Sequence, residues 1–386
     1  MIEPKLRFIA DDGSQFPDWE EKTIDEVAEC LDNKRVPVNS EERKKRVGII
    51  PYYGAGGIQG YIDDYLFDEE LVLLLEDGDA FDDFQTKSIA QYITGKSWVN
   101  NHAHVLRANG NSYFLFASLE HKDIRRWTQL AGASRKKLLK DSMLKITVNI
   151  PSLPEQQKIA DFLSTIDTVI EKQKETASAW EERKKGVMQK LFSQKVRFKA
   201  DDGDQFPEWE EKKLGEVFEF YNGKAHENVI SENGKYVVVN SKFISTDGTV
   251  RKYTNEMIFP LIKKDIVMVM SDVPNGKAIS KCFLINENNK YTLNQRICCL
   301  RTKENAVFYI NQISRNKYFL KFDDGVKQTN LRKNDILQCP LLCPCLAEQQ
   351  KIADCLSSLD EVIKKQKATL AVWEELKKGL LQQMFV

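Results

Sequence analysis

Residues 155–192 read EQQKIADFLSTIDTVIEKQKETASAWEERKKGVMQKLF, and closely similar text returns at residues 348–385. The positions of the two copies differ by a constant 193, as Trp180 and Trp373 show. Apolar residues recur in each copy with alternating spacings of four and three, which is the seam of a long coiled-coil helix. At 1.5 Å per residue each helix would run roughly 55 Å. The seam positions are Ile159, Leu163, Ile166, Ile170, Gln173, Ala177, Trp180, Lys184, Val187 and Leu191 in the first copy, and Ile352, Leu356, Leu359, Ile363, Gln366, Leu370, Trp373, Lys377, Leu380 and Met384 in the second.

Two such helices in one chain can bury their apolar stripes against each other. Because a whole domain separates them in the sequence, we expect them to pair antiparallel. Gln173 and Gln366 occupy the same seam position in the two copies. We interpret them as a polar layer that sets the register of the pair, rather than as functional residues.

A second repeat precedes each domain. Residues 7–22, RFIADDGSQFPDWEEK, recur at 197–212 as RFKADDGDQFPEWEEK with an offset of 190. The chain is therefore two copies of one plan: a short repeated segment, a variable region and a long helix. We expect the N-terminal segment to lie near the end of the second helix, which would close the two halves into a pseudo-two-fold ring.

The variable regions, about 23–150 and 213–340, mix short β-like runs with turns. KYVVVN, IVMVMSD, KCFLIN and RICCLRT read as strands in the second region. The predicted fold class is mixed α/β (α+β), with two similar globular domains separated by two long antiparallel coiled-coil helices. The predicted boundaries are 1–152 for the first domain, 153–194 for the central helix, 195–345 for the second domain and 346–386 for the C-terminal helix.

The composition restricts the class of protein. The 386 residues are 42% hydrophobic and 30% charged, with a net charge of zero, so any nucleic-acid site must be a local patch. No apolar run is long enough to span a membrane, and the N-terminus lacks the apolar core of a signal peptide. We expect a cytoplasmic protein with no membrane association.

Four of the eight cysteines, Cys339, Cys343, Cys345 and Cys355, are close enough in sequence to suggest a zinc site. The repeat argues against zinc, because the aligned positions of the first half carry other residue types. We therefore favour buried reduced thiols and expect no metal. The aligned residues are Ile146, Ile150, Ser152 and Phe162.

Catalytic motifs are not evident in the sequence. An adenine methyltransferase needs a polar residue at the start of a Pro-Pro-aromatic loop, but the nearest text begins with Ile50. Gly54-Ala55-Gly56-Gly57 precedes no clean strand–loop–helix unit, and no GxxxxGK[ST] motif is present. We expect a non-catalytic protein with no cofactor.

Local clusters of basic and amide side chains are better candidates for a site. Lys and Arg could bind phosphates, while Asn and Gln could read base edges. The alternatives are a solvated charged turn for the clusters after Gly132 and Gly325, and the exposed face of a sheet for those near Asn100 and Asn294. The candidate DNA-binding residues are Lys34, Arg35, Lys96, Asn100, Asn101, His102, His104, Arg135, Lys136, Lys137 and Lys140 in the first half, and Lys224, Asn294, Gln295, Arg296, Lys327, Gln328, Asn330, Arg332 and Lys333 in the second.

These features together resemble the specificity (S) subunit of type I restriction–modification systems. The resemblance rests on the two-copy plan and on the text that begins each long helix, EQQKIADFLS at 155–164 and EQQKIADCLS at 348–357. It rests also on YGAGGIQGYIDDY at 53–65, on WVNNHAHVLR at 98–107 and on Gly132 to Leu138. It covers essentially the whole chain. One departure is Cys345-Leu346-Ala347, which replaces the Pro154-bearing turn before the second helix.

The resemblance implies that each variable region reads one half of a split, asymmetric DNA sequence and that the helices fix the distance between the halves. It also implies that two methyltransferase (M) subunits dock on this frame for S-adenosylmethionine-dependent adenine methylation, and that restriction (R) subunits join them. The chain itself would then be non-catalytic and would bind neither S-adenosylmethionine nor ATP.

Two other classes of protein remain open. A free-standing DNA-binding regulator would use two recognition domains without methyltransferase partners. A pure interaction scaffold would bind protein or glycan through its variable domains, and sequence-selective DNA binding would exclude it.

Overall fold

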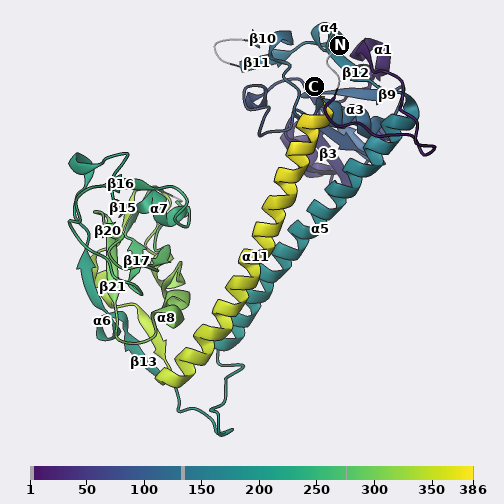
Figure 1. The fold of residues 1–386 in the computed structure, drawn as a ribbon. Helices are drawn as coiled ribbons and strands as arrows, with labels where there is room; N and C mark the ends of the chain where they lie inside the picture. Colours follow the sequence, from purple (N-terminus) through teal and green to yellow (C-terminus); the bar gives the residue numbers. More distant parts are fainter. Residues whose placement is uncertain (1–3, 132–134, 275, 386) are drawn as a thin grey trace. The chain divides into compact units, whose positions relative to one another are not determined.

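The computed structural model describes residues 4–131, 135–274 and 276–385, and it consists of two compact units. Unit 1 comprises Met1–Glu175 with Lys367–Val386, and unit 2 comprises Thr176–Gln366. Each unit therefore holds one globular domain, the first half of the long helix that follows it and the last half of the other long helix (Figure 1).

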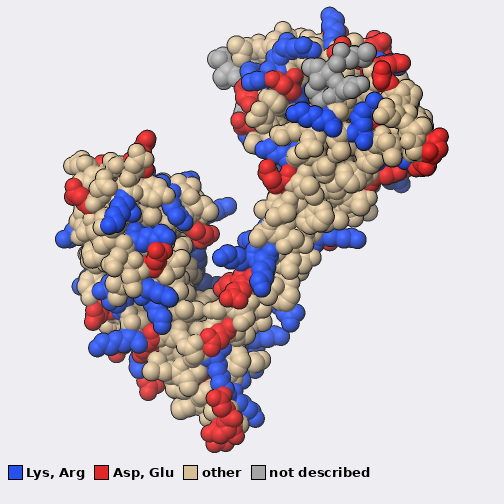
Figure 2. Space-filling model, viewed as in Figure 1, with Lys and Arg blue, Asp and Glu red and all other residues tan. Residues whose placement is uncertain are grey.

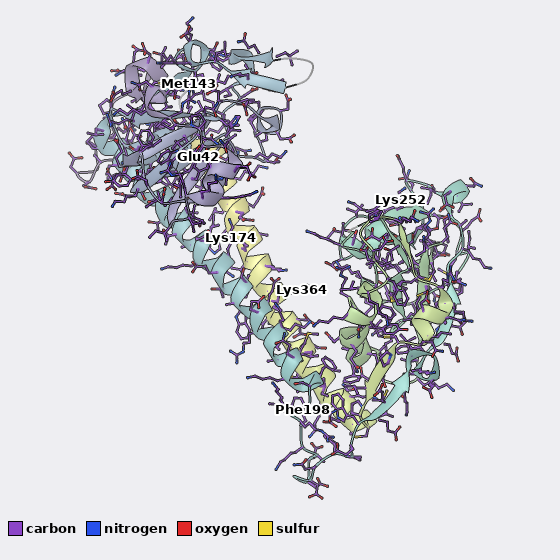
Figure 3. The ribbon with its side chains drawn as sticks, turned by 180° about the vertical axis from the view of Figure 1, so that it is seen from behind. Glu42, Met143, Lys174, Phe198, Lys252 and Lys364 are labelled. Atoms are coloured by element: carbon purple, nitrogen blue, oxygen red, sulfur yellow. The ribbon has the colours of Figure 1, made fainter. Side chains whose placement is uncertain are left out.

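The two predicted helices are present as α5 (Leu153–Phe192) and α11 (Leu346–Met384). In unit 1, Lys377 of α11 pairs with Asp167 of α5 at 2.8 Å, and in unit 2 Lys184 of α5 pairs with Asp360 of α11 at 2.6 Å. Within each unit the early residues of one helix thus meet the late residues of the other, which confirms the antiparallel pairing. Figures 1 and 3 show the helices side by side from opposite directions.

The seam positions are buried or half-buried, and the first turns of the seam have a second partner. Ile159 and Leu163 are fully buried in one cluster with residues of the first domain, such as Leu119, and with Met384 at the end of α11. Ile352 and Leu356 are buried in the same way in the second domain. The start of each helix is therefore part of a domain core, and each domain is fixed to its own helix.

Two four-stranded sheets form the body of the first domain. The first has the order β2-β9-β6-β7, and the second has the order β4-β3-β8-β5. Two further antiparallel pairs, β1–β12 and β10–β11, are two-stranded. The strands are β1 (Glu20–Thr23), β2 (Ala28–Cys30), β3 (Ile50–Gly54), β4 (Gly57–Ile62), β5 (Phe67–Asp68), β6 (Leu71–Leu75), β7 (Ala90–Ile93), β8 (Lys96–Val99), β9 (Ala103–Ala108), β10 (Thr128–Ala131), β11 (Arg135–Leu138) and β12 (Thr147–Ile150). The short helices are α1 (Ile24–Val27), η1 (Asp32–Lys34), α2 (Ser40–Lys45), η2 (Asp79–Phe81), α3 (Ser112–Leu119), η3 (Arg125–Trp127) and α4 (Lys140–Met143).

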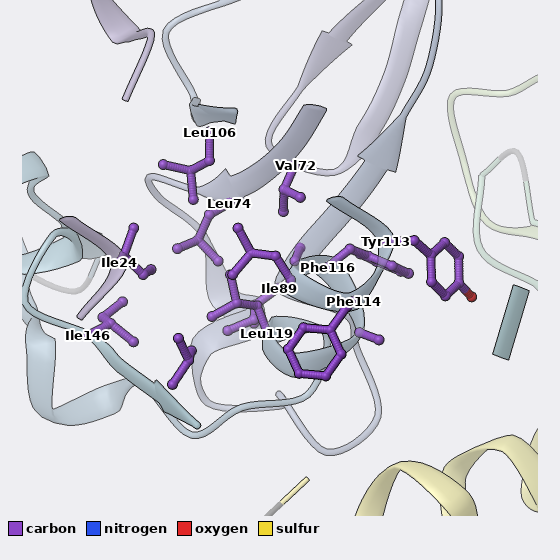
Figure 4. Close-up of a cluster of buried hydrophobic side chains, with 14 of the residues drawn as sticks. Ile24, Val72, Leu74, Ile89, Leu106, Tyr113, Phe114, Phe116, Leu119 and Ile146 are labelled. Atoms are coloured by element: carbon purple, nitrogen blue, oxygen red, sulfur yellow. The ribbon is translucent and has the colours of Figure 1, made fainter. Parts of the chain in front are cut away.

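The core of the first domain forms where α3 packs on the first sheet. Strand β6 reads LVLLL and is buried at every position, because both faces of the sheet are covered there. Val72 and Leu74 pack in one cluster with α3, and the alternate residues Leu71 and Leu73 pack in another with Phe67 and Val99. Helix α3 is also buried on all sides, and the side chain of Asn111 caps its first turn by accepting from Phe114 N. Figure 4 shows Val72 and Leu74 of β6 facing Phe114, Phe116 and Leu119 of α3.

The second domain repeats this arrangement with different residues. The sheet β14-β21-β17-β19 corresponds to β2-β9-β6-β7, and the parallel pair β15–β20 corresponds to β3–β8. Asn305 caps α8 as Asn111 caps α3. The strands are β13 (Glu210–Lys213), β14 (Glu219–Asn222), β15 (Tyr236–Val239), β16 (Lys252–Thr254), β17 (Ile266–Val269), β18 (Ser271–Asp272), β19 (Cys282–Leu284), β20 (Tyr291–Leu293), β21 (Ile297–Arg301), β22 (Thr329–Asn330) and β23 (Pro340–Cys343). The helices are α6 (Leu214–Val217), η4 (Glu227–Val229), α7 (Ser241–Ser245), α8 (Ala306–Ile313), α9 (Lys317–Leu320) and α10 (Lys333–Leu337).

The four runs predicted as strands in the second region are confirmed as β15, β17 with β18, β19 and β21. The cysteines are free thiols, but only part of the burial prediction holds. Cys339 and Cys343 are buried, whereas Cys345 and Cys355 are half-buried. Of these four, only Cys343 lies within a strand, β23.

The predicted contact between the N-terminal segment and the end of the second helix is confirmed within unit 1. The Trp19 ring lies 6.4 Å from the Phe385 ring, and Phe385 packs on Phe114 at 5.5 Å between centroids. In unit 2, Phe192 packs on Phe308 in the same way, at 5.6 Å.

Candidate nucleic-acid interface

Three segments that are far apart in sequence meet at one end of the first sheet in unit 1. They are the turn after β2, the β8–β9 connection and the β10–β11 hairpin. Glu76, directly after β6, links them: its N–H donates to His102 O at 3.1 Å, and its carbonyl accepts from Leu138 N at 2.7 Å. Its carboxylate accepts from Arg35 Nη1 at 2.6 Å. The three sets of candidates in this half of the sequence therefore come together.

The same convergence occurs in unit 2. Lys224, after β14, forms a parallel bridge with Asn294, and its carbonyl accepts from Gln295 N at 3.0 Å. Met270, after β17, donates to Arg296 O and accepts from Leu331 N at 2.8 Å. The candidates around Lys224, Asn294 and Asn330 thus surround one end of the equivalent sheet.

The backbone framework at these two ends is the same, whereas the side chains differ. Three backbone hydrogen bonds of unit 1 have counterparts in unit 2. Asn100 N donates to Tyr53 O, as Asn294 N donates to Val239 O; Glu76 N donates to His102 O, as Met270 N donates to Arg296 O. Leu138 N donates to Glu76 O, as Leu331 N donates to Met270 O. A common framework with different side chains is suited to recognition of two different ligands by two similar modules.

An ionic cluster that is buried at His104 and half-buried elsewhere supports the interface in unit 1. Arg35 bonds to both Asp32, at 3.1 Å, and Glu76, and its side chain is only 14% exposed. His104 is 1% exposed; its Nδ1 lies 2.6 Å from Asp32 Oδ2 and its Nε2 lies 2.9 Å from Leu138 O. Burial raises the pKa of Asp32, but its bonds with His104, Val105 N and Arg35 outweigh burial and hold that pKa below its usual value. Arg35 and His104 therefore act first as internal supports of the hairpin.

Within the described ranges, Asp32, Glu76 and His104 are the one group whose ligand atoms lie close enough together to hold a metal ion. The guanidinium of Arg35 already bonds both carboxylates, and both ring nitrogens of His104 face acceptors. The guanidinium of Arg35 thus supplies the positive charge that neutralises Asp32 and Glu76, in the place that a metal ion would otherwise take.

The other candidates of unit 1 fall into two groups. Lys34, Lys96, Asn101 and Lys140 are exposed, and His102 is 42% exposed beside Asp77. Asn100 is buried, and its Oδ1 accepts from His102 N, so it shapes the turn. Lys136 and Lys137 of β11 pair with Asp82 and Glu76. Gly132 and the side chain of Arg135 lie outside the described residues.

The candidates of unit 2 are more open. Asn294 is the exception, because its Oδ1 is buried with no hydrogen-bond partner among the described atoms. Gln295 donates to Glu227, and Gln328 donates to Ser271 Oγ at 2.6 Å. Arg296, directly before β21, holds a positive φ of 66°. The exposed candidates are Lys224, Gln295, Arg296, Lys327, Gln328, Asn330, Arg332 and Lys333.

Some residues at these sheet ends carry no signal that sequence reasoning could use. Asp32 and Glu76 organise the unit 1 cluster, but isolated acidic residues next to apolar strands are common in sequences. Arg43 and Arg46 stack over Tyr52 and Trp98 at 4.7 and 4.5 Å, and this pairing emerges only from the tertiary fold. Figure 2 shows Lys and Arg mixed with Asp and Glu over the visible face of each unit, in keeping with local rather than global positive charge.

No helix in the described part of the chain is long and apolar enough to cross a membrane.

Comparison with known proteins gives consistent matches. A type I restriction enzyme specificity subunit of Haemophilus influenzae is 40% identical over 157 residues, which cover 40% of this chain and 38% of that protein. The type I restriction enzyme MjaVIII specificity subunit of Methanocaldococcus jannaschii is 25% identical over 96% of this chain and 92% of its own length. The S subunit of a type I restriction–modification system from M. genitalium has a similar fold, with a TM-score of 0.64 at 16% identity over 100% of this chain and 99% of its own.

The family described as type I restriction modification DNA specificity domain matches residues 17–177 and 207–372. These two matches cover most of the chain, one in each half. The chain therefore belongs to the family of type I restriction–modification DNA specificity subunits.

Proposed function

We propose that this chain is the DNA sequence-recognition subunit of a type I restriction–modification complex and that it is itself non-catalytic. Each variable domain reads one half of a bipartite, asymmetric DNA target. The observation that carries this proposal is the pair of equivalent sheet ends, which share three backbone hydrogen bonds but present different side chains. Two similar modules with different surfaces suit two different half-sites.

The exposed candidates, together with Arg135, Lys136 and Lys137 of β11, supply the chemistry for DNA recognition. Lys and Arg neutralise phosphates, while Asn, Gln and Arg can form paired hydrogen bonds with base edges in the major groove. Arg35, Asn100, His104 and Asn294 hold the framework beneath them. The proposed contact residues are Lys34, Lys96, Asn101, His102, Arg135, Lys136, Lys137 and Lys140 in the first domain, and Lys224, Gln295, Arg296, Lys327, Gln328, Asn330, Arg332 and Lys333 in the second.

The long helices set the spacing between the half-sites and dock the partner subunits. Helix α5 has 40 residues and would measure about 60 Å at 1.5 Å per residue, while one turn of DNA measures roughly 34–36 Å. Closely similar helical text occurs twice in the chain, so it fits two copies of one methyltransferase (M) subunit. These partners transfer the methyl group of S-adenosylmethionine to adenine, and restriction (R) subunits join the complex.

The test is to delete the gene in its host and map methylated adenines by single-molecule sequencing. Loss of one split, asymmetric motif supports the proposal. An unchanged methylation map contradicts it and favours a free-standing two-domain DNA-binding regulator.

The role of the helices has its own test. Four residues inserted into each helix should change the tolerated gap between the half-sites and leave both half-site sequences unchanged. A change of half-site sequence at a constant gap would refute the spacing role.

A further inference from the structure

Unit 1 contains a cavity of about 960 Å³ that belongs neither to the helix seam nor to the candidates found from the sequence. The end of α3, the short helix η3, the loop at Phe84 and the last turns of α11 enclose it. We call it the Trp127 pocket and define it by Phe84, His121, Lys122, Arg126, Trp127 and Lys378.

The lining of the Trp127 pocket is strongly cationic. Lys122, Arg125, Arg126 and Lys378 line it, and Asp123 is its single acidic residue. Asp123 is bound by Arg125, with Nη2–Oδ2 and Nε–Oδ1 distances of 2.6 and 2.9 Å. Among the described residues, no carboxylate forms an ion pair with Lys122, Arg126 or Lys378. Three positive charges therefore face the cavity without compensation by a bonded anion.

Two contacts hold the lining in place before any ligand binds. The guanidinium carbon of Arg126 lies 3.7 Å from the centroid of the Trp127 ring, which fixes the orientation of its donors. His121 Nδ1 lies 2.6 Å from Phe84 O, and the ring donates to that carbonyl. A rigid guanidinium with free N–H groups is well suited to bind two oxygens of one anion.

The pKa of Lys122 is lowered from its ordinary value. Burial lowers its pKa, and the neighbouring charge of Arg126 lowers it further, whereas Glu21 acts in the opposite direction. An anion placed between Lys122 and Arg126 would relieve this repulsion and would favour the charged form of both side chains.

The position of the pocket connects it with the proposed DNA surface. Trp127 is followed directly by β10, the first strand of the hairpin that carries Lys136 and Lys137. Ile89 links the two regions, because its N–H donates to Glu120 O next to the pocket and its carbonyl accepts from Leu75 N at the end of β6. Segments that line the pocket thus lead directly to the end of the sheet that carries the candidate interface.

We propose that the Trp127 pocket binds phosphate groups, and that the DNA backbone is their source. The identification of DNA as the source of the phosphates rests on the proposed function. The affinity for phosphate groups is inferred from the residues of the pocket alone. Lys122, Arg126 and Lys378 supply the donors to the phosphate oxygens. Contacts of this kind position the domain on DNA without reading sequence.

The first experiment measures pyrophosphate binding to the full chain by calorimetry. A variant carrying K122Q, R126Q and K378Q should bind pyrophosphate at least tenfold more weakly than the unmodified chain. K185Q is the matched control, because Lys185 is the repeat equivalent of Lys378 on α5 and pairs with Glu182. Circular dichroism of each variant verifies that it is folded. Because Arg126 is exposed, R126Q alone should leave the fold intact and reproduce part of the loss of pyrophosphate affinity.

The second experiment measures the salt dependence of binding to a non-specific DNA duplex. Each lost phosphate contact should reduce the slope of log K against log salt by about 0.9, while the half-site preference stays unchanged. Weaker pyrophosphate binding with an unchanged slope would assign the pocket to free phosphate compounds and overturn DNA as the source. Unchanged binding of both probes would overturn the proposal. The half-site assignment is tested by the methylation map and the phosphate pocket by these two binding experiments. A failure of one proposal can therefore be distinguished from a failure of the other.

Discussion

The backbone N–H of Leu6 donates to the carbonyl of Gln383 at 3.1 Å, which joins the N-terminal segment to the last turn of α11. Val196 N and Lys190 O make the equivalent bond at 3.3 Å, where the second repeated segment follows α5 without a break. The same bond thus forms in unit 1 between segments far apart in sequence and in unit 2 between consecutive segments. The junction between α5 and the second repeated segment is structurally equivalent to the contact between α11 and the first repeated segment.

This equivalence predicts that the chain tolerates circular permutation. A permutant with the original ends joined by a short linker and opened between Gln194 and Lys195 should fold and keep its DNA specificity. The Leu6 N–Gln383 O bond already forms between segments that are not consecutive in sequence, so the Val196 N–Lys190 O bond should form likewise. Thermal unfolding followed by circular dichroism should show a loss of only a few degrees. A permutant opened between Leu73 and Leu74, inside buried β6, is the control and should not fold. Failure of the first permutant under conditions in which the parent folds would contradict the equivalence.

Removal of Arg197 should destabilise unit 2 strongly. Its Nε and Nη2 bond both oxygens of Glu348 at 3.1 and 2.9 Å, and Glu348 is completely buried at the start of α11. Arg197→Ala leaves that carboxylate without its charge partner and should cost about 3 kcal/mol in the free energy of unfolding, measured by urea denaturation. Glu208, which is 90% exposed and lies 3.3 Å from Arg197, provides the control: Glu208→Ala should cost no more than about 0.5 kcal/mol. Equal losses for the two variants would refute the role of burial.

Lys377 and Lys184 occupy the same seam position but should differ in their contribution to stability. Lys377 is 13% exposed and pairs with both Glu120 and Asp167, whereas Lys184 pairs with Asp360, which is 56% exposed. Lys377→Met should therefore cost about 3 kcal/mol and Lys184→Met less than about 1 kcal/mol in the free energy of unfolding.

The pH dependence gives this comparison a second readout. Burial lowers the pKa of Lys377, but Glu120 and Asp167 raise it by more, so the folded-state pKa lies above the ordinary value of 10.5. The stabilisation should be fully present below pH 10 and should disappear as the pH rises through the folded-state pKa. Equal losses of unfolding free energy for Lys377→Met and Lys184→Met near pH 7 would show that the pairs of Lys377 with Glu120 and Asp167 add no stability.

Asp32 should make the free energy of unfolding depend on pH in the acidic range. Its folded-state pKa is below the ordinary 3.8, so its ionised form contributes stability above that pH, and the contribution is lost as the pH falls towards the lower folded-state pKa. The difference in unfolding free energy between the parent and Asp32→Asn should be constant above about pH 5 and should shrink below about pH 4. Urea midpoints measured between pH 3 and 7 provide the test, and a difference that does not vary with pH would contradict it.

The repeats made the long helices, their antiparallel pairing and the contact of the N-terminal segment with α11 predictable. The seam spacing identifies Ile159 and Ile352 as buried because a helix has a fixed period, whatever it packs against. The sequence could not show that these first turns belong to the domain cores, because that depends on where α3 and α8 lie.

The candidate interface was predictable in its residue types but not in their roles. Arg35 and His104 resemble DNA-binding residues in the sequence, yet the structure pairs both with acidic side chains beneath the surface. Arg35 bonds Glu76 and His104 bonds Asp32, which lie 41 and 72 positions away in sequence. The Trp127 pocket was missed for a related reason. Lys122 and Lys378 are 256 positions apart in sequence, and only the packing of α11 against the end of α3 places them in one cavity.

The central claim is that each domain reads its own half-site, and a domain exchange tests it most directly. Residues 213–340 would be replaced by the corresponding region of another specificity subunit, and methylated adenines would be mapped by single-molecule sequencing in a host that carries the partner subunits. The account predicts a new target in which one half-site changes while the other half-site and the gap stay the same. A target that changes in both halves, or in neither, would contradict it.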